Sequence, residues 1–304
     1  MTTSETPTIV GLGEVLWDCF GNSRRPGGAP ANVAFHAQQL GGRGVVCSRV
    51  GNDALGEELI SHLAGHGLAT EFIQHDAHHP TGTVTVDSTD ADAPRFTIHT
   101  GVAWDHLAFD APLAQLAREA RAVCFGTLAQ RSHVTRDTIR QFVDCVDDDC
   151  LRVFDVNMRE QWYDRESIEW SLAHADLAKL NGDEVLRLGA LFEIDGDGVA
   201  EVAAGLGERL AVPVVCVTRG GEGCLLIGDG ETCDVPSDEI EVVDAVGAGD
   251  AFTAALVSAR LAGWPLERSG RFANDVGRLV VRHEGAMPDL CEEFAQLKQC
   301  YAEV

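Results

Sequence analysis

The stretch Glu241-Val242-Val243-Asp244-Ala245-Val246-Gly247-Ala248-Gly249-Asp250-Ala251-Phe252-Thr253-Ala254-Ala255-Leu256 carries the most information about the fold. An apolar approach ends in a Gly-Ala-Gly turn, and small residues at helical spacing follow it. The first amides of a helix lack intrahelical partners and the helix dipole adds positive potential, so this turn should bind anions. Its glycines permit a tight turn and the close approach of a phosphate to the backbone.

Asp250 stands in the first turn of the predicted helix, beside any anion that the amides hold. One interpretation is structural, because an acidic side chain in the first turn complements the helix dipole. The other is catalytic, because a transferred γ-phosphoryl group needs donors around it and an acceptor for the incoming hydroxyl proton. An aspartate near its ordinary pKa would suffice, since positioning carries most of the work in a loose transition state. The spacing alone leaves both interpretations open.

Outside this stretch, apolar runs alternate with helical patterns and predict an α/β layered sheet. The runs expected to form buried parallel strands are Val45–Val50, Ala122–Phe125, Val153–Val156 and Val214–Val217. Between about Thr81 and Thr100 apolar and polar residues alternate, which predicts a half-exposed antiparallel hairpin, while the polar residues 21–25 should form a turn. We expect a single domain over residues 1–304, with a small β lid formed from about 14–26 and 80–104.

The composition limits the partners of this 304-residue chain. It has 48 acidic and 23 basic residues and a formal net charge of -25, which argues against nucleic acid, because a polyanion needs clustered positive charge. No apolar stretch reaches the length of a membrane span, and Met1–Thr8 has none of the features of a signal peptide. We expect a cytoplasmic protein without a membrane partner, whose ten scattered cysteines are reduced, buried thiols. His75, His78 and His79 should lie in a solvated loop rather than in a metal site.

Two further glycine-rich loops could contact a ligand. Pro26–Asn32 precedes a helical pattern, so it is either a simple turn or a loop that brings the Asn32 amide against the hydroxyls of a polar ligand. Thr218–Gly223 follows an apolar run and is either a hairpin turn or a nucleotide contact. A P-loop is excluded, because neither of the two lysines, Lys179 and Lys298, follows a glycine.

Taken together, these loops and several other blocks resemble the ribokinase-like (PfkB) carbohydrate kinases over nearly the whole chain. The matching blocks, in the family's order, are Gly-Gly-Ala-Pro-Ala-Asn at 27–32, Arg-Val-Gly-Asn-Asp-Ala-Leu-Gly at 49–56, Asp-Val-Asn-Met-Arg at 155–159, Asn-Gly-Asp-Glu at 181–184, Thr-Arg-Gly-Gly-Glu-Gly at 218–223 and Asp-Ala-Val-Gly-Ala-Gly-Asp at 244–250. The resemblance implies a ribokinase-like α/β/α fold with a β lid, ATP as phosphoryl donor, and Mg²⁺.

The resemblance also implies roles for particular residues. Asp250 would be the catalytic base, and the amides of Gly247, Ala248, Gly249 and Asp250 would form the anion hole. The residues implied for ATP and magnesium are Asn181, Glu184 (Mg²⁺ through water), Thr218, Gly220, Gly223 and Asn274. Those implied for the acceptor are Asp18, Gly27, Gly28, Asn32, Phe96 and Arg159. A monovalent cation such as K⁺ is common in the family, and the backbone around Asp244, Val246, Gly285 and Asp289 could bind it.

The acceptor is expected to be D-fructose, phosphorylated at its 6-hydroxyl. The Gly-Gly-Ala-Pro-Ala-Asn block is similar to fructokinases, although Asn181-Gly182-Asp183-Glu184 lacks one acidic residue of the fructokinase pattern. The alternatives are ribose, a nucleoside or a keto-deoxy sugar acid such as 2-keto-3-deoxygluconate. The arginines that could pair with its carboxylate are Arg24, Arg25, Arg95 and Arg159. For Arg24, Arg25 and Arg95, solvated loop positions are the favoured interpretation.

Three further questions stay open from the sequence. Phe96 and Trp104 could stack on an acceptor ring, although burial within the lid is the favoured alternative. A catalytically silent sugar sensor of the same fold is the rival from another class, and the intact Gly-Ala-Gly-Asp turn argues against it. A homodimer is plausible, because lid strands pair subunits in some relatives.

Overall fold

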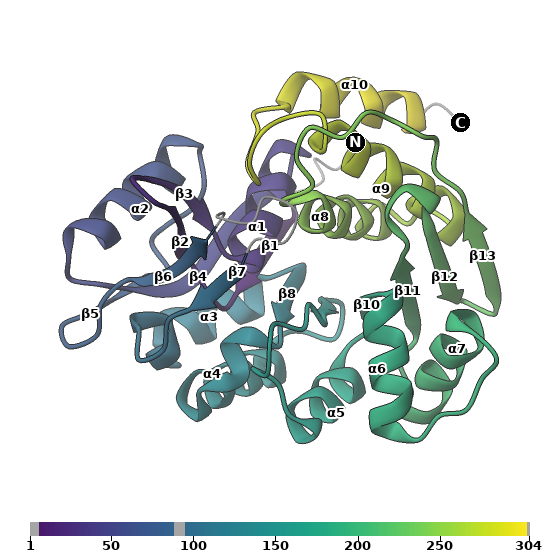
Figure 1. Ribbon diagram of the computed structural model, residues 1–304, viewed down its shortest axis with the longest axis horizontal. Helices are drawn as coiled ribbons and strands as arrows, with labels where there is room; N and C mark the ends of the chain where they lie inside the picture. Colours follow the sequence, from purple (N-terminus) through teal and green to yellow (C-terminus); the bar gives the residue numbers. More distant parts are fainter. Residues whose placement is uncertain (1–5, 88–94, 303–304) are drawn as a thin grey trace.

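The computed structural model describes residues 6–87 and 95–302, and within them the larger sheet has nine strands. In spatial order the strands are β13 (Glu231–Val235), β12 (Cys224–Gly228), β11 (Val214–Thr218), β10 (Leu177–Asn181), β9 (Leu151–Asp155), β8 (Ala122–Gly126), β1 (Thr8–Leu12), β4 (Arg43–Gly51) and β5 (Ile73–Asp76) (Figure 1). The pairs from β11 to β5 are parallel, and β12 and β13 are antiparallel additions. The predicted layered sheet and its four parallel strands are confirmed.

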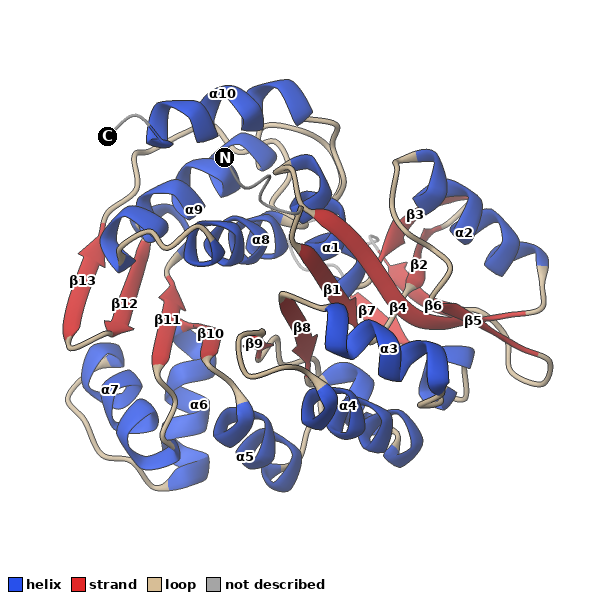
Figure 2. Cartoon of the chain, turned by 180° about the vertical axis from the view of Figure 1, so that it is seen from behind, coloured by secondary structure: helices blue, strands red, loops and turns tan. Residues whose placement is uncertain are grey.

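Helices cover both faces of this sheet, as Figures 1 and 2 show. One layer contains α1 (Ala29–Gln39), α8 (Ala248–Leu261), α9 (Leu266–Val280) and α10 (Cys291–Ala302), and the other contains α3 (Ala111–Glu119), α4 (His133–Cys145), α5 (Arg165–His174), α6 (Gly182–Phe192) and α7 (Val199–Leu210). Neighbouring strand residues point to opposite layers: Ile9 packs with α1 and α8, whereas Val10 packs with α3 and α4. Both faces of the parallel strands are therefore buried, which explains their continuous apolar runs.

A second, four-stranded sheet contains the segments predicted for the lid. Its order is β3 (Ser23–Gly27), β2 (Leu16–Phe20), β6 (Gly82–Asp87) and β7 (Arg95–Ile98), and residues 88–94 lie outside the described part of the chain. The expectation of a turn over 21–25 is wrong beyond Asn22, because Ser23–Gly27 pairs antiparallel with β2. One face of the sheet packs on α2 (Ala54–Gly65), where Trp17 joins a cluster with Leu59 and Leu63.

The cysteines and histidines lie partly where the sequence predicts and partly elsewhere. All ten cysteines are free thiols, but only five of them are buried. Cys19, Cys145 and Cys233 are partly buried, and Cys291 and Cys300 are exposed on the outermost helix, α10. His75 belongs to β5 rather than to a loop, and no group of three or more potential metal-binding side chains occurs among the described residues. None of the helices in the described part is long and apolar enough to cross a membrane.

Candidate active site

The sheet places its chemistry-bearing residues where parallel strands end. Asp155 ends β9, Asn181 ends β10 and Thr218 ends β11, and these strands are adjacent. Because the carboxyl ends of parallel strands meet at one edge, three polar side chains from distant parts of the sequence come together. The start of α8 packs over the same part of the sheet, where Thr253 reaches Asp155.

The start of α8 has a backbone that only glycine suits. Gly247 precedes the helix with φ 79°, and a Cβ added there would lie 2.6 Å from the Cα of Ala286. A side chain would therefore meet both conformational strain and a backbone clash. The amides of Gly249 and Asp250 have no backbone acceptor in the part of the chain that the structure describes. This helix N-terminus is thus free to receive an anion.

The Asp250 carboxylate lies in the first turn of α8 and accepts a hydrogen bond of 2.7 Å at Oδ2 from Asn32 Nδ2. Burial, and then the negative charge of Asp155, raise its pKa to about 6, against the Asn32 bond and the charges of Lys179 and Arg159. The pKa of Asp250 thus lies above the ordinary value that would already suffice for a base, because the enclosed position and the neighbouring acid both disfavour the anion. Asp250 is still ionised at neutral pH and can accept a proton.

A buried ion pair lies against the first turn of α8. Lys179 Nζ is 3.1 Å from both carboxylate oxygens of Asp155, and Thr253 Oγ1 donates to Asp155 Oδ2 at 3.2 Å. A Cβ on Gly249 would lie 3.3 Å from Lys179 Nζ, so the ammonium group contacts the helix start. Burial lowers the pKa of Lys179, but the negative charges of Asp155 and Asp250 outweigh it and the net shift is upward. The lysine therefore stays charged and supplies positive potential beneath the anion-binding turn.

The loop before α1 brings the predicted acceptor residues together. Gly28 has φ 111°, and a Cβ there would lie 2.5 Å from the Glu14 carbonyl oxygen. A Cβ on Gly27 would lie 2.4 Å from Asp18 Oδ2, so the Asp18 carboxylate rests on this loop. Burial raises the pKa of Asp18 to about 6, and the charge of Arg159 opposes the shift. Asn32 Oδ1 is buried without a hydrogen-bond partner among the described residues, which leaves one strong acceptor for a ligand.

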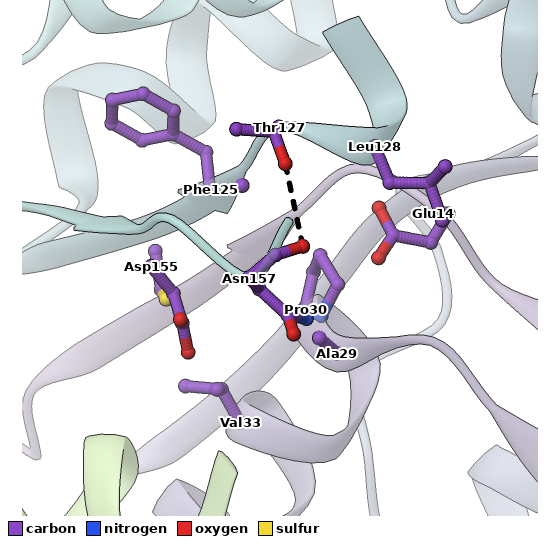
Figure 3. Close-up of a pocket in the computed structure, with 11 residues that line it drawn as sticks. Glu14, Ala29, Pro30, Val33, Phe125, Thr127, Leu128, Asp155 and Asn157 are labelled. Carbon is purple, nitrogen blue, oxygen red and sulfur yellow. Dashed lines mark hydrogen bonds between the residues drawn. The ribbon is translucent and has the colours of Figure 1, made fainter. Parts of the chain in front are cut away.

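Glu14 is a buried acid that sequence reasoning did not assign to the site. Its carboxyl group points into a small cavity of about 10 Å³, which Asp155 and Asn157 also line, and its Oε2 has no partner among the described residues (Figure 3). Burial is the main cause that raises the pKa of Glu14 to about 7. The negative charge of Asp250 raises this pKa further, and the positive charge of Arg159 lowers it. The positive charge of Arg159 thus opposes the rise in pKa of all three acids, Asp18, Glu14 and Asp250.

Four of the six residues predicted for ATP and magnesium, all except Asn181 and Glu184, line one cavity of about 540 Å³ beside the start of α8. They are joined by apolar side chains that could enclose an aromatic base. The lining residues of both kinds are Thr218, Gly220, Gly223, Asn274, Ala248, Gly249, Ile240, Val242, Phe252 and Val281. Asn274 Nδ2 donates to the carbonyls of Val235 and Pro236 at 3.2 and 3.4 Å, so its amide also fixes the wall of the cavity. The volume lies within the usual range for a small-molecule site.

Asn181 and Glu184 form a capping box at the start of α6. Asn181 Oδ1 accepts from the Glu184 amide at 2.9 Å, and Glu184 Oε2 accepts from the Asn181 amide at 2.8 Å. Glu184 Oε1 accepts from the Met158 amide at 2.7 Å. Burial raises the pKa of Glu184, although these amides favour its charged form. The carboxylate is held rigidly and retains lone pairs for water molecules.

Three of the four residues predicted around a monovalent cation are joined at Asp244. Asp244 Oδ1 accepts from the Val246 amide at 3.0 Å, and Asp244 Oδ2 accepts from the Gly285 amide at 2.9 Å. Val246 is 48% exposed, and Asp289 is exposed, accepting from the Cys291 amide at the start of α10. A residue that the sequence placed in a solvated loop, Arg25, contacts Asp244 instead.

Phe96 is 52% exposed, so its expected burial within the lid is wrong, whereas Trp104 is buried at 1% as expected. Strand pairing explains where Phe96 lies. Phe96 of β7 is opposite Val86 of β6, and Val84, two residues earlier on β6, is opposite Asp18 of β2. Residues in register, and every second residue along a strand, share a face. Phe96 and Asp18 are therefore on the same face of the small sheet.

Lys179 and Asp155 were also missed as site residues. The signal that could have found them is their surroundings, since each is a charged residue within a short apolar run: Lys179 in the middle of β10 and Asp155 at the end of β9. A charge is seldom fully buried without a partner, so two opposite charges in such runs predict a pair.

Comparisons with known proteins agree with this geometry. A family model described as pfkB family carbohydrate kinase matches residues 6–292. The chain is 34% identical over 271 residues to a sugar kinase of Pyrococcus horikoshii, covering 86% of this chain and 83% of that protein. A structure of that kinase in complex with ATP matches with a TM-score of 0.77, at 30% identity over 93% of this chain and 94% of the other.

Two fructokinases are among the other relatives. One, from Vibrio alginolyticus, is 29% identical over 277 residues and covers 87% of this chain and 88% of its own. The structure of the other, from Xylella fastidiosa with bound ATP, has a TM-score of 0.83 at 22% identity over 97% of this chain and 99% of its own. The second likeness shows that the ribokinase-like fold is shared.

Proposed function

The chain belongs to the pfkB family of carbohydrate kinases, and from this premise we propose that it transfers the γ-phosphoryl group of ATP to the 6-hydroxyl of D-fructose. As a family member it is an ATP-dependent phosphotransferase that acts on a sugar hydroxyl. The observation that carries the proposal is the 2.7 Å bond between Asn32 and Asp250. It joins Asn32, in the first turn of α1, to Asp250, in the first turn of α8.

We propose that Asp250 is the base. The acceptor hydroxyl would give its proton to the Asp250 carboxylate while its oxygen attacks the γ-phosphorus, and the bond to the β-phosphate oxygen would break to release ADP. The free amides at the start of α8, with Lys179 beneath them, would stabilise the charge on the transferred group. A carboxylate with a pKa of about 6 is matched to this task, because it is ionised at neutral pH and yet basic enough to accept a proton.

The cavity of about 540 Å³ would hold the nucleotide, with its apolar walls around the adenine and its Ala248-Gly249 end at the phosphates. Mg²⁺ fits the chemistry here, because Glu184 presents a rigid carboxylate and Mg²⁺ prefers oxygen ligands and retained water. When bound, the ion would neutralise phosphate charge. We propose Asn181 and Glu184 as the residues that hold its waters.

D-Fructose is proposed from the relatives and from the polar groups of the acceptor loop. Fructokinases recur among the relatives, including that of Escherichia coli at 29% identity over 294 residues. The Asp18 carboxylate and the free Asn32 Oδ1 provide acceptors for several hydroxyls. The small sheet would act as a lid that brings Asp18 and Phe96, which share a face, over the sugar.

One observation favours a second acceptor, a keto-deoxy sugar acid. Arg159 has an exposed side chain, and its positive charge lowers the pKa values of Glu14, Asp18 and Asp250, the acids near the predicted acceptor residues. An arginine in that position could form a bidentate pair with a substrate carboxylate.

An acceptor screen tests the proposal. The purified protein is mixed with ATP and Mg²⁺, and ADP release is measured with D-fructose, ribose, adenosine, glucose and 2-keto-3-deoxygluconate. We expect the highest kcat/KM with fructose. With fructose as acceptor, the substitution Arg159→Gln should change kcat/KM only slightly. If the sugar acid gives the highest value and Arg159→Gln removes that preference, the second acceptor is the correct one. Release of ADP with none of them would contradict the proposal and favour a silent sensor.

A further inference from the structure

Asp244 joins the loop that leads into α8 to the loop that follows α9. Its Oδ1 accepts from the Val246 amide at 3.0 Å, and its Oδ2 accepts from the Gly285 amide at 2.9 Å. The Asp244 amide itself donates to the Val281 carbonyl at 3.2 Å. Because Gly247 follows three residues later, the position of this carboxylate fixes the turn that carries the anion-binding amides.

Arg25 reaches this carboxylate from the small sheet. Its Nη1 is 3.3 Å from Asp244 Oδ2, and its Nη2 is 3.2 Å from Glu284 Oε2. The guanidinium group also lies 5.6 Å from the centre of the Phe20 ring. One cation therefore connects β3 to both loops next to the start of α8.

A monovalent cation fits these residues poorly while Arg25 is in place. A K⁺ ion bound to the backbone around Asp244 and Gly285 would lie beside the Arg25 guanidinium group. Arg25 Nη1 is 3.3 Å from Asp244 Oδ2 and would be 4.0 Å from a Cβ built on Gly285. Two positive charges held this close together repel each other.

We propose that Arg25 is a positioning residue that takes the place of a bound monovalent cation at Asp244. Its guanidinium group supplies the positive charge that holds the two loops together, so the helix start is ordered without K⁺. Since Arg25 lies on the small sheet, this order also depends on the sheet being docked against the loops. The inference rests on the proposed kinase function and concerns only how the anion-binding turn is held.

The test replaces Arg25 and asks whether K⁺ rescues the loss. ADP release is measured for wild type and Arg25→Ala in KCl and in N-methylglucamine chloride at equal ionic strength, with Arg24→Ala as the matched control. Arg24 is the neighbour on the same strand, but it pairs with Glu58 and lies over Trp17 on the other face. We expect wild type and Arg24→Ala to change less than about twofold between the salts. Arg25→Ala should lose about tenfold in kcat in N-methylglucamine and recover most of it in KCl.

A second readout separates this inference from the kinase function. Thermal unfolding in the two salts should show K⁺-specific stabilisation of Arg25→Ala and none for wild type or Arg24→Ala, whatever the acceptor is. Arg25→Lys, which keeps the charge, should resemble wild type. The inference is overturned if K⁺ activates wild type tenfold over N-methylglucamine, or if Arg25→Ala responds like wild type in both measurements. If wild type releases no ADP but K⁺ stabilises Arg25→Ala and neither wild type nor Arg24→Ala, the kinase function is rejected. The positioning role of Arg25 is then kept.

Discussion

Glu14 shows how one buried acid changes the stability of the whole chain with pH. Burial raises its pKa from 4.5 to about 7, so the folded state holds this proton more tightly than the unfolded state does. Between pH 4.5 and pH 7, Glu14 is therefore ionised in the unfolded chain while it is still protonated in the folded chain. The contribution of Glu14 to stability is therefore full below pH 4.5 and is lost as the pH rises through 7.

We predict that the free energy of unfolding of Glu14→Gln rises relative to wild type between pH 4.5 and pH 7, by on the order of 3 kcal/mol. Glutamine keeps the size and polarity of the side chain without a charge to bury. Urea unfolding at a series of pH values measures the difference, and Glu208→Gln, at an exposed position of α7, controls for the loss of one acid. A difference between Glu14→Gln and wild type that stays constant with pH would rule out a titrating Glu14.

At the scale of elements, α8 has a positive-φ glycine at each end, and only one of them adjoins the site. Gly247 has φ 79° and lies against Ala286, whereas Gly263 has φ 74° and an added Cβ would find open space. Alanine at Gly263 should cost about 1–2 kcal/mol of stability from backbone strain alone. Alanine at Gly247 should cost more and weaken binding of a non-hydrolysable ATP analogue, because the clash displaces the helix start.

Urea midpoints and titration calorimetry of Gly247→Ala and Gly263→Ala test this difference. Both variants replace a glycine of positive φ by alanine, so they introduce the same side chain and similar backbone strain. A loss of nucleotide affinity seen only in Gly247→Ala is therefore caused by the change in the anion-binding turn. Equal affinities in the two variants would show that the turn before α8 is not where the phosphates bind.

The elements were largely predictable because their signals are local. Four apolar runs identified parallel strands, and the Gly-Ala-Gly turn identified the start of α8. β3 was missed because Ser23–Gly27 is polar, contains Pro26 and has no period of two, as suits an edge strand. The Lys179–Asp155 pair and the contact of Arg25 with Asp244 could not be read from local patterns, since 219 positions separate the latter two residues.

On the scale of the whole molecule, the net charge of -25 should make stability depend on salt. Acidic side chains outnumber basic ones by 48 to 23, so the folded chain concentrates negative charge that added ions screen. We predict that the thermal midpoint rises by roughly 5 °C or more from 0.1 to 2 M KCl. N-Methylglucamine chloride should have a similar effect on wild type, since screening does not require a particular cation. A midpoint that falls with both salts would mean that attractive ion pairs outweigh the repulsion.

The proposed phosphoryl transfer depends most on Asp250 as the base at the start of α8. The most direct measurement is fructose-dependent ADP release by wild type and Asp250→Asn over pH 5–9, with binding of an ATP analogue measured in parallel. We predict that kcat/KM of wild type rises with pH through about 6, where Asp250 ionises, and that Asp250→Asn loses about 10³-fold in kcat while still binding nucleotide. Unchanged phosphoryl transfer by Asp250→Asn would contradict the assignment, and the acid would then serve only to complement the dipole of α8.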